Sequence, residues 1–474
     1  MSNLFSTTRI PVGLTRSNSA RMRRYTKEED GMVTIFACFT LLMMLLVCGI
    51  AIDMMRNEME RVRIQNTADR AVLAAADLDQ TLDPQTVVND YFAKAGIPDR
   101  SNGVKVSEGL NFRTVSVNSD SVTPTNFMRL LGINELPLRS RSEAEERVTN
   151  VEISLVLDIS GSMGQGDKMP QLRDAAREFV DTVIRPETQD LVSLSLIPYS
   201  EHVSAGPALL SKFNVNYNNP YSHCMEFDSS DFTSTRLRRD KTYKQVQHFQ
   251  WGYDGYSNDV STPVCPNGTY EDITPLSQDA NSLKFQIGQL VPRGSTSIFA
   301  GMKWASGLLD PDFNEITQQL VTENRVDPIF SSRPASFSDS ETLKTVILMT
   351  DGKNHYSYRI SDSYYANSSH ASHWARYNLH WYLNNYVHPY YHNSFRYMKY
   401  TPSIGNDLLD SVCDAVKAKN IVIWSIGFEV DDYGASVMRD CASSPSHFFR
   451  VEGVEISDAF KAIARQINQL RLTQ

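Results

Sequence analysis

The chain has 474 residues, of which 41% are hydrophobic and 21% are charged. This balance is ordinary for a globular protein and excludes wholesale disorder, while the length allows about three domains. The 46 basic and 55 acidic side chains give a formal net charge of −9. A net acidic chain without a long basic run is a poor candidate for binding nucleic acid, so we expect no nucleic-acid partner.

The N-terminal region combines a polar segment with one long apolar run. Residues 1–30 carry an excess of basic side chains and are expected to form a cytoplasmic tail, because basic flanks stay on that side of a membrane. Residues 32–52 contain no charged side chain, and as a helix they would rise about 31 Å, which matches the hydrocarbon core of a bilayer. A cleaved signal peptide has a shorter apolar core, of about 7–15 residues. The run therefore predicts a retained single-pass anchor in the lipid bilayer.

The cysteines indicate in which cellular compartment the chain after residue 53 is located. Four of the six lie outside the apolar run and allow three pairings, of which their order along the chain favours Cys224–Cys265 and Cys413–Cys441. Four unpaired thiols are the alternative. Because disulfides persist in an oxidising compartment, the favoured pairing predicts a protein of the bacterial inner membrane whose C-terminal part is periplasmic.

Two regions follow the tail and precede the main domain. Residues 31–80 are expected to form the transmembrane helix and its continuation, because small and apolar residues recur every three or four positions beyond residue 63. Residues 81–148 mix helical and alternating patterns and predict a small α+β unit. Its expected elements are a helix at 90–95, strands at 103–107 and 112–118, a short helix at 127–131 and an edge strand at 136–142.

Residues 149–474 alternate between strand and helix patterns. Such alternation predicts an α/β domain, with a doubly wound, mostly parallel, Rossmann-like sheet that has helices on both faces. The expected strands are 151–157, 191–197, 345–349 and 421–426, with 345–349 central, and the expected helices are 172–183, 285–290, 298–309, 408–419 and 456–470. Insertions at about 213–275 and 353–402 are too long for ordinary loops, so they are expected to be functional or partly disordered.

Three short stretches carry the chemistry. Asp158, Ser160 and Ser162 follow the first strand, Thr296 precedes a helix, and Asp351 follows the central strand. Ligands bind parallel α/β sheets at the carboxyl ends of the strands, so these stretches are expected to converge there. Hydroxyl oxygens are suitable ligands for a hard cation such as Mg²⁺, with Mn²⁺ or Ca²⁺ as alternatives. The carboxylates would not contact the ion and would instead orient its waters or the hydroxyls. With few anionic ligands on it, the ion would accept a carboxylate from another protein.

The pattern DxSxS with a distant Thr and Asp resembles the metal-ion-dependent adhesion site of von Willebrand factor type A domains. By this resemblance Asp158, Ser160, Ser162, Thr296 and Asp351 are the five site positions, all intact. The resemblance implies a Rossmann-like fold and metal-dependent binding of a carboxylate-bearing protein, without catalysis.

The N-terminal region resembles a second family. Residues 31–36 (Gly-Met-Val-Thr-Ile-Phe), the apolar span, Asp53 and residues 64–76 (Ile-Gln-Asn-Thr-Ala-Asp-Arg-Ala-Val-Leu-Ala-Ala-Ala) are similar to the TadE/TadG-like segment of Flp (tight adherence, Tad) pilus assembly proteins. This implies a role in pilus assembly, a pilin-like small unit, and partners in the pilus or secretion machinery. A type IV prepilin would carry Glu five residues after the cleavage glycine, where this chain has Phe36, so the anchor is expected to be retained.

Two other functions remain open at this point. An exported metal-dependent hydrolase would use the ion to activate water and would need a general base beside it. A structural subunit would carry the same residues as a non-functional metal site. The histidines of the second insertion are a weaker signal, for a transition-metal site or for an aromatic contact surface.

Overall fold

The structure is a computed structural model that describes residues 32–77, 80, 82–108, 112–147, 150–252, 254–339 and 341–473. The tail expected for residues 1–30 lies outside these residues. The chain divides into two units, Met1–Glu146 and Arg147–Gln474. The finer division into tail, anchor, small unit and α/β domain stays a prediction.

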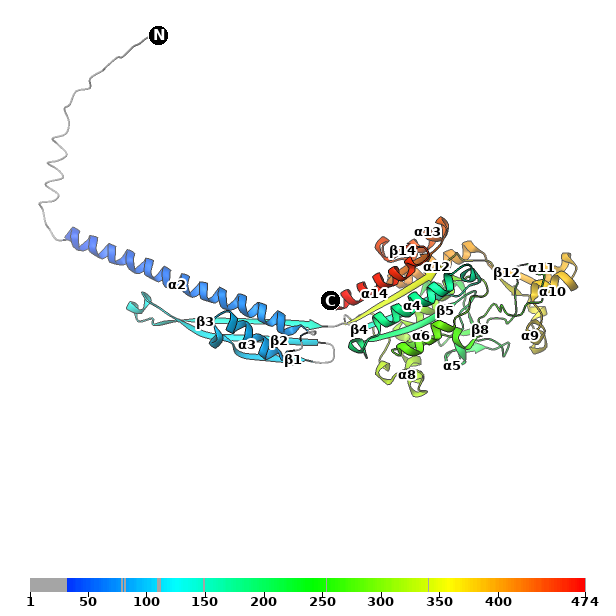
Figure 1. Ribbon diagram of the computed structural model, residues 1–474, viewed down its shortest axis with the longest axis horizontal. Helices are drawn as coiled ribbons and strands as arrows, with labels where there is room; N and C mark the ends of the chain where they lie inside the picture. The colour runs from blue at the N-terminus through cyan, green and yellow to red at the C-terminus, as the bar shows by residue number, and fades with distance from the viewer. Residues whose placement is uncertain are drawn as a thin grey trace, which may run out of the picture. The chain divides into compact units, whose positions relative to one another are not determined.

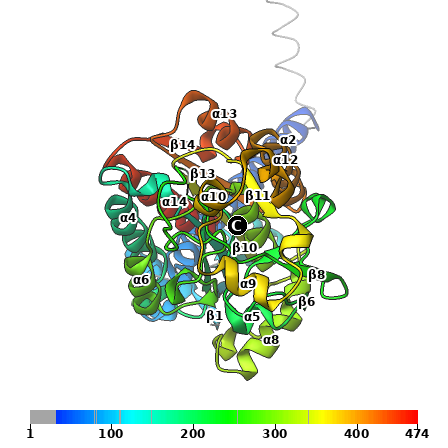
Figure 2. The same ribbon diagram turned by 90° about the vertical axis from the view of Figure 1, so that its right-hand side faces the viewer.

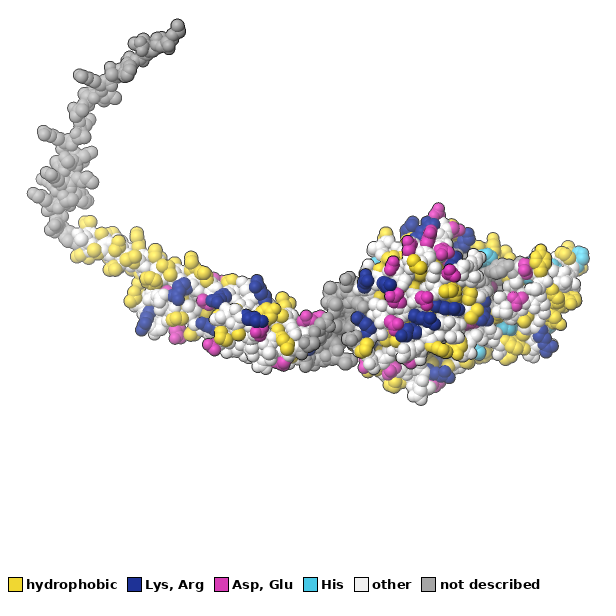
Figure 3. Space-filling model, viewed as in Figure 1, with side chains coloured by type: hydrophobic (Ala, Val, Ile, Leu, Met, Phe, Trp, Pro, Cys, Tyr) yellow, Lys and Arg dark blue, Asp and Glu magenta, His cyan; other side chains and the backbone are white. Residues whose placement is uncertain are grey.

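The first unit is organised around one long helix, α2 (Met32–Ala76), shown in Figure 1. Its length and apolar composition are sufficient to cross a membrane. Hydrophobic side chains cover its N-terminal half in Figure 3, and most of them are exposed. The second half has one buried stripe, which includes Ile64, Ala68, Ala71 and Ala75. The predicted apolar helix and its continuation are therefore confirmed as one element.

The rest of this unit is a short helix and a three-stranded sheet that pack against the buried stripe of α2. The elements are α3 (Pro84–Lys94), β1 (Asn102–Glu108), β2 (Phe112–Pro124) and β3 (Glu135–Arg147), with strand order β1-β2-β3. Phe92 of α3, Val115 of β2 and Leu138 of β3 share one core with α2. The helix predicted at 90–95 begins earlier, because Pro84 stands at its first position and Asp83 caps it by accepting the N–H of Thr86.

The second unit contains a six-stranded sheet in the order β14-β13-β10-β4-β5-β9, counted over the described residues. Its five neighbouring strands from β14 to β5 are parallel, and β9 pairs antiparallel with β5 at the edge. The strand predicted to be central, β10, lies in the middle beside β4. The strands are β4 (Asn150–Asp158), β5 (Val192–Tyr199), β9 (Thr274–Ser277), β10 (Thr342–Thr350), β13 (Val422–Phe428) and β14 (Phe448–Val451).

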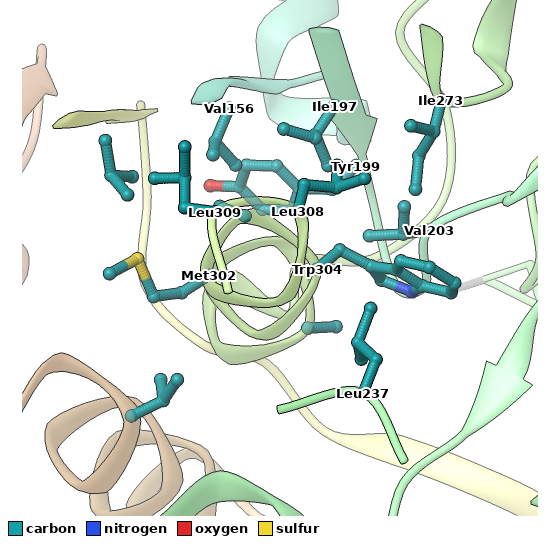
Figure 4. Packing of buried hydrophobic residues seen from close by; sticks show 14 of the residues in the cluster. Val156, Ile197, Tyr199, Val203, Leu237, Ile273, Met302, Trp304, Leu308 and Leu309 are labelled. Carbon is teal, nitrogen blue, oxygen red and sulfur yellow. The ribbon is translucent and has the colours of Figure 1, made fainter. Parts of the chain in front are cut away.

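Helices cover both faces of this sheet, so the predicted mixed α/β class is confirmed (Figures 1 and 2). The helices α4, α6 and α14 pack on one face, and α7, α12 and α13 contribute to the hydrophobic cluster of the other. Figure 4 shows Met302, Trp304 and Leu308 of α7 with Val156 of β4 and Tyr199 of β5. These helices are α4 (Lys168–Val183), α6 (Ala280–Gln289), α7 (Ile298–Leu308), α12 (Pro402–Lys417), α13 (Asp432–Cys441) and α14 (Glu455–Thr473). A further helix, α8 (Asn314–Thr322), contributes to the same cluster as α7.

The two insertions fold and share one hydrophobic cluster. Phe249 and Val264 of the first pack with Trp374 and Leu379 of the second, next to the Cys224–Cys265 disulfide. A second disulfide joins Cys413 and Cys441, so both predicted pairings are confirmed. The elements here are α5 (Gly206–Leu210), β6 (Asn214–Asn216), β7 (Met225–Glu226), β8 (Thr242–Gln245), β11 (Ser357–Ile360), α9 (Ser368–Trp374), α10 (Leu379–Tyr386), α11 (His392–Phe395) and β12 (Arg396–Tyr400).

Candidate functional site

The candidate site lies at the carboxyl edge of the sheet, between β4 and β10. From β4 the chain proceeds to β5 on one side, and from β10 it proceeds to β13 on the other, so the winding direction reverses between these two strands. A crevice forms at such a reversal because the connections leave in opposite directions. Asp158 is the last residue of β4, and Asp351 directly follows β10.

Asp158 is fully buried and both of its carboxylate oxygens accept hydrogen bonds. Oδ1 accepts the backbone N–H of Ser160 at 2.7 Å. Oδ2 accepts the hydroxyl of Thr350 at 2.6 Å and that of Tyr199 at 3.3 Å. The carboxylate therefore fixes the turn after β4 and ties it to the end of β10.

Ser160, Ser162 and Asp351 form a chain of hydrogen bonds. The Ser162 hydroxyl donates to Asp351 Oδ1 at 2.6 Å, and the Oγ atoms of Ser160 and Ser162 are 3.1 Å apart. Because the Ser162 proton is directed at Asp351, Ser160 is the donor between the two hydroxyls. A hydroxyl that gives its proton to a carboxylate keeps its oxygen lone pairs for another partner. We call Asp158, Ser160, Ser162 and Asp351 the aspartate–serine cluster.

Backbone hydrogen bonds bring the third predicted stretch to the same edge. The N–H of Gly161 donates to the carbonyl of Gly294 at 3.0 Å, and that of Arg293 donates to the carbonyl of Ile159 at 2.8 Å. A Cβ atom on Gly161 would come within 3.1 Å of the Gly294 oxygen, so this close approach favours glycine. The carbonyl of Thr296 accepts the N–H of His355 at 2.9 Å. All three stretches therefore converge as expected, with Thr296 joined through its backbone.

The aspartate–serine cluster is short of positive charge. Burial, together with the nearby charge of Asp351, raises the pKa of Asp158 to about 7. The one cation that contacts it among the described residues is Lys168, whose Nζ lies 2.9 Å from Asp351 Oδ2 and 3.7 Å from Glu429. Of the two buried carboxylates, Asp351 is therefore the one that has a cation in contact, among the residues that the structure describes.

Sequence reasoning missed Lys168, although a signal was present. It is the first residue of α4, and no acidic side chain stands in the first turn of that helix. A cation at a helix N-terminus is disfavoured by the helix dipole, so such a lysine needs an anion elsewhere. That anion is Asp351.

Two further features of this edge bear on whether an ion fits. The hydroxyls of Ser200 and Ser295 are buried and have no hydrogen-bond partner among the residues that the structure describes, and Ser200 Oγ lies 3.4 Å from where a Cβ of Gly294 would stand. Buried polar atoms are rarely left in that condition without a water or an ion. Within the described parts of the chain no group of three or more His, Cys, Asp or Glu side chains is placed to hold a metal. The donor set here is instead two carboxylates with hydroxyls, which fits a hard, oxygen-seeking cation.

A second buried polar cluster lies beside the first, behind the end of β5. Arg359 donates to both carboxylate oxygens of Glu226 at 2.8 Å, and Lys399 lies 2.7 Å from the same carboxylate. Glu201 accepts the Ser357 hydroxyl at 2.7 Å. Because arginine has only donors, the Nε2 atom of His202, 3.0 Å from Arg359, is the acceptor and the imidazole is neutral. We call Glu201, His202, Glu226, Arg359 and Lys399 the arginine–glutamate cluster.

The histidines of the second insertion lie among aromatic rings. His380 stacks on Trp251 with ring centroids 4.8 Å apart, and His373 contacts Trp374, Tyr377 and Tyr382. These contacts correspond to the aromatic interpretation of that segment. The transition-metal alternative stays a prediction.

Comparisons with known proteins give one family match and several distant structures. Residues 31–78 match the family model described as putative Flp pilus-assembly TadE/G-like. No curated protein matches the chain in sequence. Similar solved structures include the vWF domain of the type V pili tip protein Mfa5 from Porphyromonas gingivalis, at 14% identity over 69% of this chain and 97% of that one, with a TM-score of 0.36.

Two other structures are similar at the same level. The pilus adhesin RrgA from Streptococcus pneumoniae is 10% identical over 77% of this chain and 49% of that chain, with a TM-score of 0.36. Proximal thread matrix protein 1 from the mussel byssus, with a zinc-occupied MIDAS motif, is 14% identical over 68% of this chain and 48% of that chain, with a TM-score of 0.31. At these identities and scores the likeness does not assign a site.

Proposed function

We propose that this chain is a membrane-anchored protein of Flp (Tad) pilus assembly that binds a partner protein through a metal-ion-dependent adhesion site. In this proposal residues 149–474 form a von Willebrand factor type A domain. The observation that carries the proposal is the aspartate–serine cluster, at the point where the sheet reverses its winding. There Asp158 fixes the backbone of Ser160, Asp351 orients the hydroxyl of Ser162, and the two hydroxyls contact each other. The family match at residues 31–78 supports the role in pilus assembly.

The ion would be held by Ser160, Ser162 and Thr296, with Asp158 and Asp351 behind them. A bound Mg²⁺ supplies Lewis acidity toward an incoming oxygen, so it favours a partner that presents a carboxylate. The protein's own contribution is orientation. Asp351 accepts a hydrogen bond from the Ser162 hydroxyl, and Asp158 fixes the backbone of Ser160, so the hydroxyl oxygens are held before any ligand arrives.

The anchor and the disulfides support the proposed location. The apolar part of α2 is sufficient to cross a bilayer, and a basic flank precedes it in the sequence. Disulfides Cys224–Cys265 and Cys413–Cys441 persist in an oxidising compartment. We therefore place the N-terminus in the cytoplasm and the second unit in the periplasm, with the bacterial inner membrane between them.

The test is a titration of the full chain in lipid nanodiscs with Mg²⁺ and with Mn²⁺, followed by capture of an aspartate-containing peptide. The double variant Ser160→Ala, Ser162→Ala is expected to lose heat of binding and capture, because it removes the two hydroxyl oxygens. Retained metal binding and capture in this variant would contradict the proposal.

A matched control comes from a second serine pair. Ser336 and Ser338 are also two residues apart, and their hydroxyls are 2.9 Å apart on the exposed surface. Ser336→Ala with Ser338→Ala removes the same atoms without touching the site, so it should bind metal as the unaltered chain does. Equal losses in both double variants would show a general effect of removing hydroxyls.

Two alternatives make different predictions in the same experiment. A structural subunit with a non-functional site would show no heat of metal binding in the unaltered chain. An exported hydrolase would turn over ester or phosphate substrates. The geometry favours binding over hydrolysis because both oxygens of Asp158 and both oxygens of Asp351 already accept hydrogen bonds, so neither buried carboxylate offers a free oxygen as a base.

A further inference from the structure

The loop between β2 and β3 carries apolar side chains that stay partly or largely exposed in the described chain. We call residues 125–134 the β2–β3 tip. Leu130 is 80% exposed and Leu131 is 51% exposed, and Phe127 and Ile133 are each 41% exposed. The single charged residue of the tip is Arg129. Four large apolar side chains in one short loop are unusual on a surface that faces water.

The tip is attached to α2 by hydrogen bonds. The carboxylate of Asp53 accepts the backbone N–H groups of Asn126, Phe127 and Met128 at 3.0, 2.7 and 2.8 Å. Asp53 is only 2% exposed as a result. At the base of the loop, the N–H of Thr125 donates a hydrogen bond to the carbonyl of Asn134 at 2.9 Å. Together with the three hydrogen bonds to Asp53, this bond gives the tip a defined position along the helix.

That position is level with the membrane-spanning part of α2. A Cβ atom on Gly49 would lie 2.5 Å from the Phe127 ring, so the ring packs directly on the helix backbone there. Gly49 precedes Asp53 by four residues, one helical turn, and lies inside the apolar run that ends at residue 52. The ring of Phe127 is therefore beside the hydrocarbon-spanning segment, although the tip is distant from that segment in sequence.

We propose that the β2–β3 tip inserts into the leaflet from which α2 emerges, as a second membrane contact beside the helix. Leu130, Leu131 and Ile133 would enter the acyl region, and Arg129 would extend to the lipid phosphates. This inference rests on the proposed membrane insertion of residues 32–52. The continuity of the tip with that segment is the reason to choose lipid as its occupant over a protein.

The insertion also explains the arrangement of Asp53. A carboxylate at the end of a transmembrane run is costly in a low-dielectric setting unless it is hydrogen-bonded. The tip supplies three N–H donors and shields the carboxylate from lipid. Asp53 in turn holds the apolar loop against the helix, so each stabilises the other at the membrane boundary.

The experiment places a nitroxide spin label on single cysteines of the full chain in nanodiscs of phosphatidylethanolamine and phosphatidylglycerol. Leu130→Cys and Leu131→Cys are made with Cys38→Ala and Cys48→Ala, and the disulfides are kept by omitting reductant. Collision of the label with O₂, which concentrates in lipid, is compared with collision with a water-soluble nickel chelate. We expect a ratio of O₂ to nickel collision several-fold higher at 130 and 131 than at an exposed reference position.

Two references make the result decisive. Leu73 is 67% exposed on the same helix, about 30 Å beyond Asp53, so Leu73→Cys reports water. Cys38, labelled in a Cys48→Ala chain, reports the membrane core. If the labels at positions 130 and 131 collide with the nickel chelate as often as the label at position 73 does, the proposal is overturned. It is also overturned if these labels are shielded from both O₂ and the nickel chelate, because that result would show that protein covers the tip. Nickel accessibility at Cys38 would instead overturn the membrane span itself.

Discussion

The two buried polar clusters lie behind neighbouring strands, β4 and β5, but they are balanced differently. The arginine–glutamate cluster contains two carboxylates and two cations. Arg359 lowers the pKa of Glu226 although burial opposes this, whereas burial raises the pKa of Glu201 to about 7. The aspartate–serine cluster contains two buried carboxylates, and in the described part of the chain Lys168 is the one cation that contacts it, through Asp351. Burial and the charge of Asp351 raise the pKa of Asp158 there to about 7. One cluster is complete with its own side chains, whereas the other has an excess of negative charge.

This difference separates a structural role from a binding role. A buried charge is tolerated when it is paired and hydrogen-bonded, which describes Arg359 and Glu226. An uncompensated pair of carboxylates destabilises the protein unless a cation joins it. We infer that the arginine–glutamate cluster attaches the insertions to the sheet and that the aspartate–serine cluster is kept for a ligand.

The largest effect is expected from breaking the balanced cluster. Arg359→Met leaves Glu226 with only the partly exposed Lys399, so the second unit should lose about 3–5 kcal/mol of its free energy of unfolding. Urea unfolding of the full chain in nanodiscs, followed by tryptophan fluorescence, measures this because all five tryptophans are in the second unit. They are Trp251, Trp304, Trp374, Trp381 and Trp424.

The matched control is an exposed arginine pair in the same unit. Arg450 lies 2.7 Å from Asp432, and the two side chains are 43% and 95% exposed. Arg450→Met should change the free energy of unfolding by less than about 1 kcal/mol, because water screens such a pair. Equal losses in the two variants would show that burial does not distinguish the pairs, and the contrast between the clusters would fail.

A smaller, pH-dependent effect is expected in the unbalanced cluster. The folded-state pKa of Asp158, about 7, is above its ordinary value of 3.8, so between pH 4 and 7 the folded state binds the extra proton. Stability from this group is therefore gained as the pH falls through 7 and lost as it rises. In chelator, acidification from pH 8 to 5 should stabilise the unaltered chain relative to Asp158→Asn by more than about 1.4 kcal/mol, the equivalent of one pKa unit.

The comparison with Asp158→Asn is needed because other groups titrate in the same range. Burial raises the pKa of Glu201 to about 7 and lowers that of His202 to about 3, and both groups are present in the two chains. Their contributions cancel in the difference between unfolding free energies measured at each pH. A difference that is constant from pH 8 to 5 would show that Asp158 is not electrostatically strained.

Much of this edge of the sheet could be predicted from sequence because its signals are local. A strand pattern followed by Asp158 places that residue at a carboxyl end, and three such stretches in an α/β alternation meet at one rim. The disulfides followed from chain order. The helix predicted at 90–95 begins instead at Pro84, as α3. A proline interrupts a helix interior but is well suited to the first turn, so it did not mark where this helix starts.

The remaining features depend on contacts between residues distant in sequence. Arg359 and Glu226 are 133 residues apart on separate insertions, and the contact of Asp53 with the β2–β3 tip spans 73 to 75 residues. No periodicity of the chain encodes such pairs. The edge strand β9 is short and antiparallel, so its pattern was too brief to distinguish from a loop. The sequence shows Lys168 at the start of a helix, where a positive charge is unfavourable. It does not show that Asp351 is the anion that pairs with it, because the two residues meet only in the folded chain.

The smallest effect concerns Lys168, which occupies the place of a counter-ion for Asp351. Replacing it with methionine removes a positive charge that repels an incoming metal ion and competes for the carboxylate, so Mg²⁺ should bind about five times more tightly, equivalent to roughly 1 kcal/mol after screening. Calorimetric titration measures this, and Lys353→Met is the control, since Lys353 lies on the same rim but contacts Asp431 at 3.2 Å. If both variants tightened binding equally, the general charge of the rim would be responsible. Unchanged or weaker binding in Lys168→Met alone would mean that the ammonium group supports the site, and the deficit of positive charge inferred for the aspartate–serine cluster would be wrong.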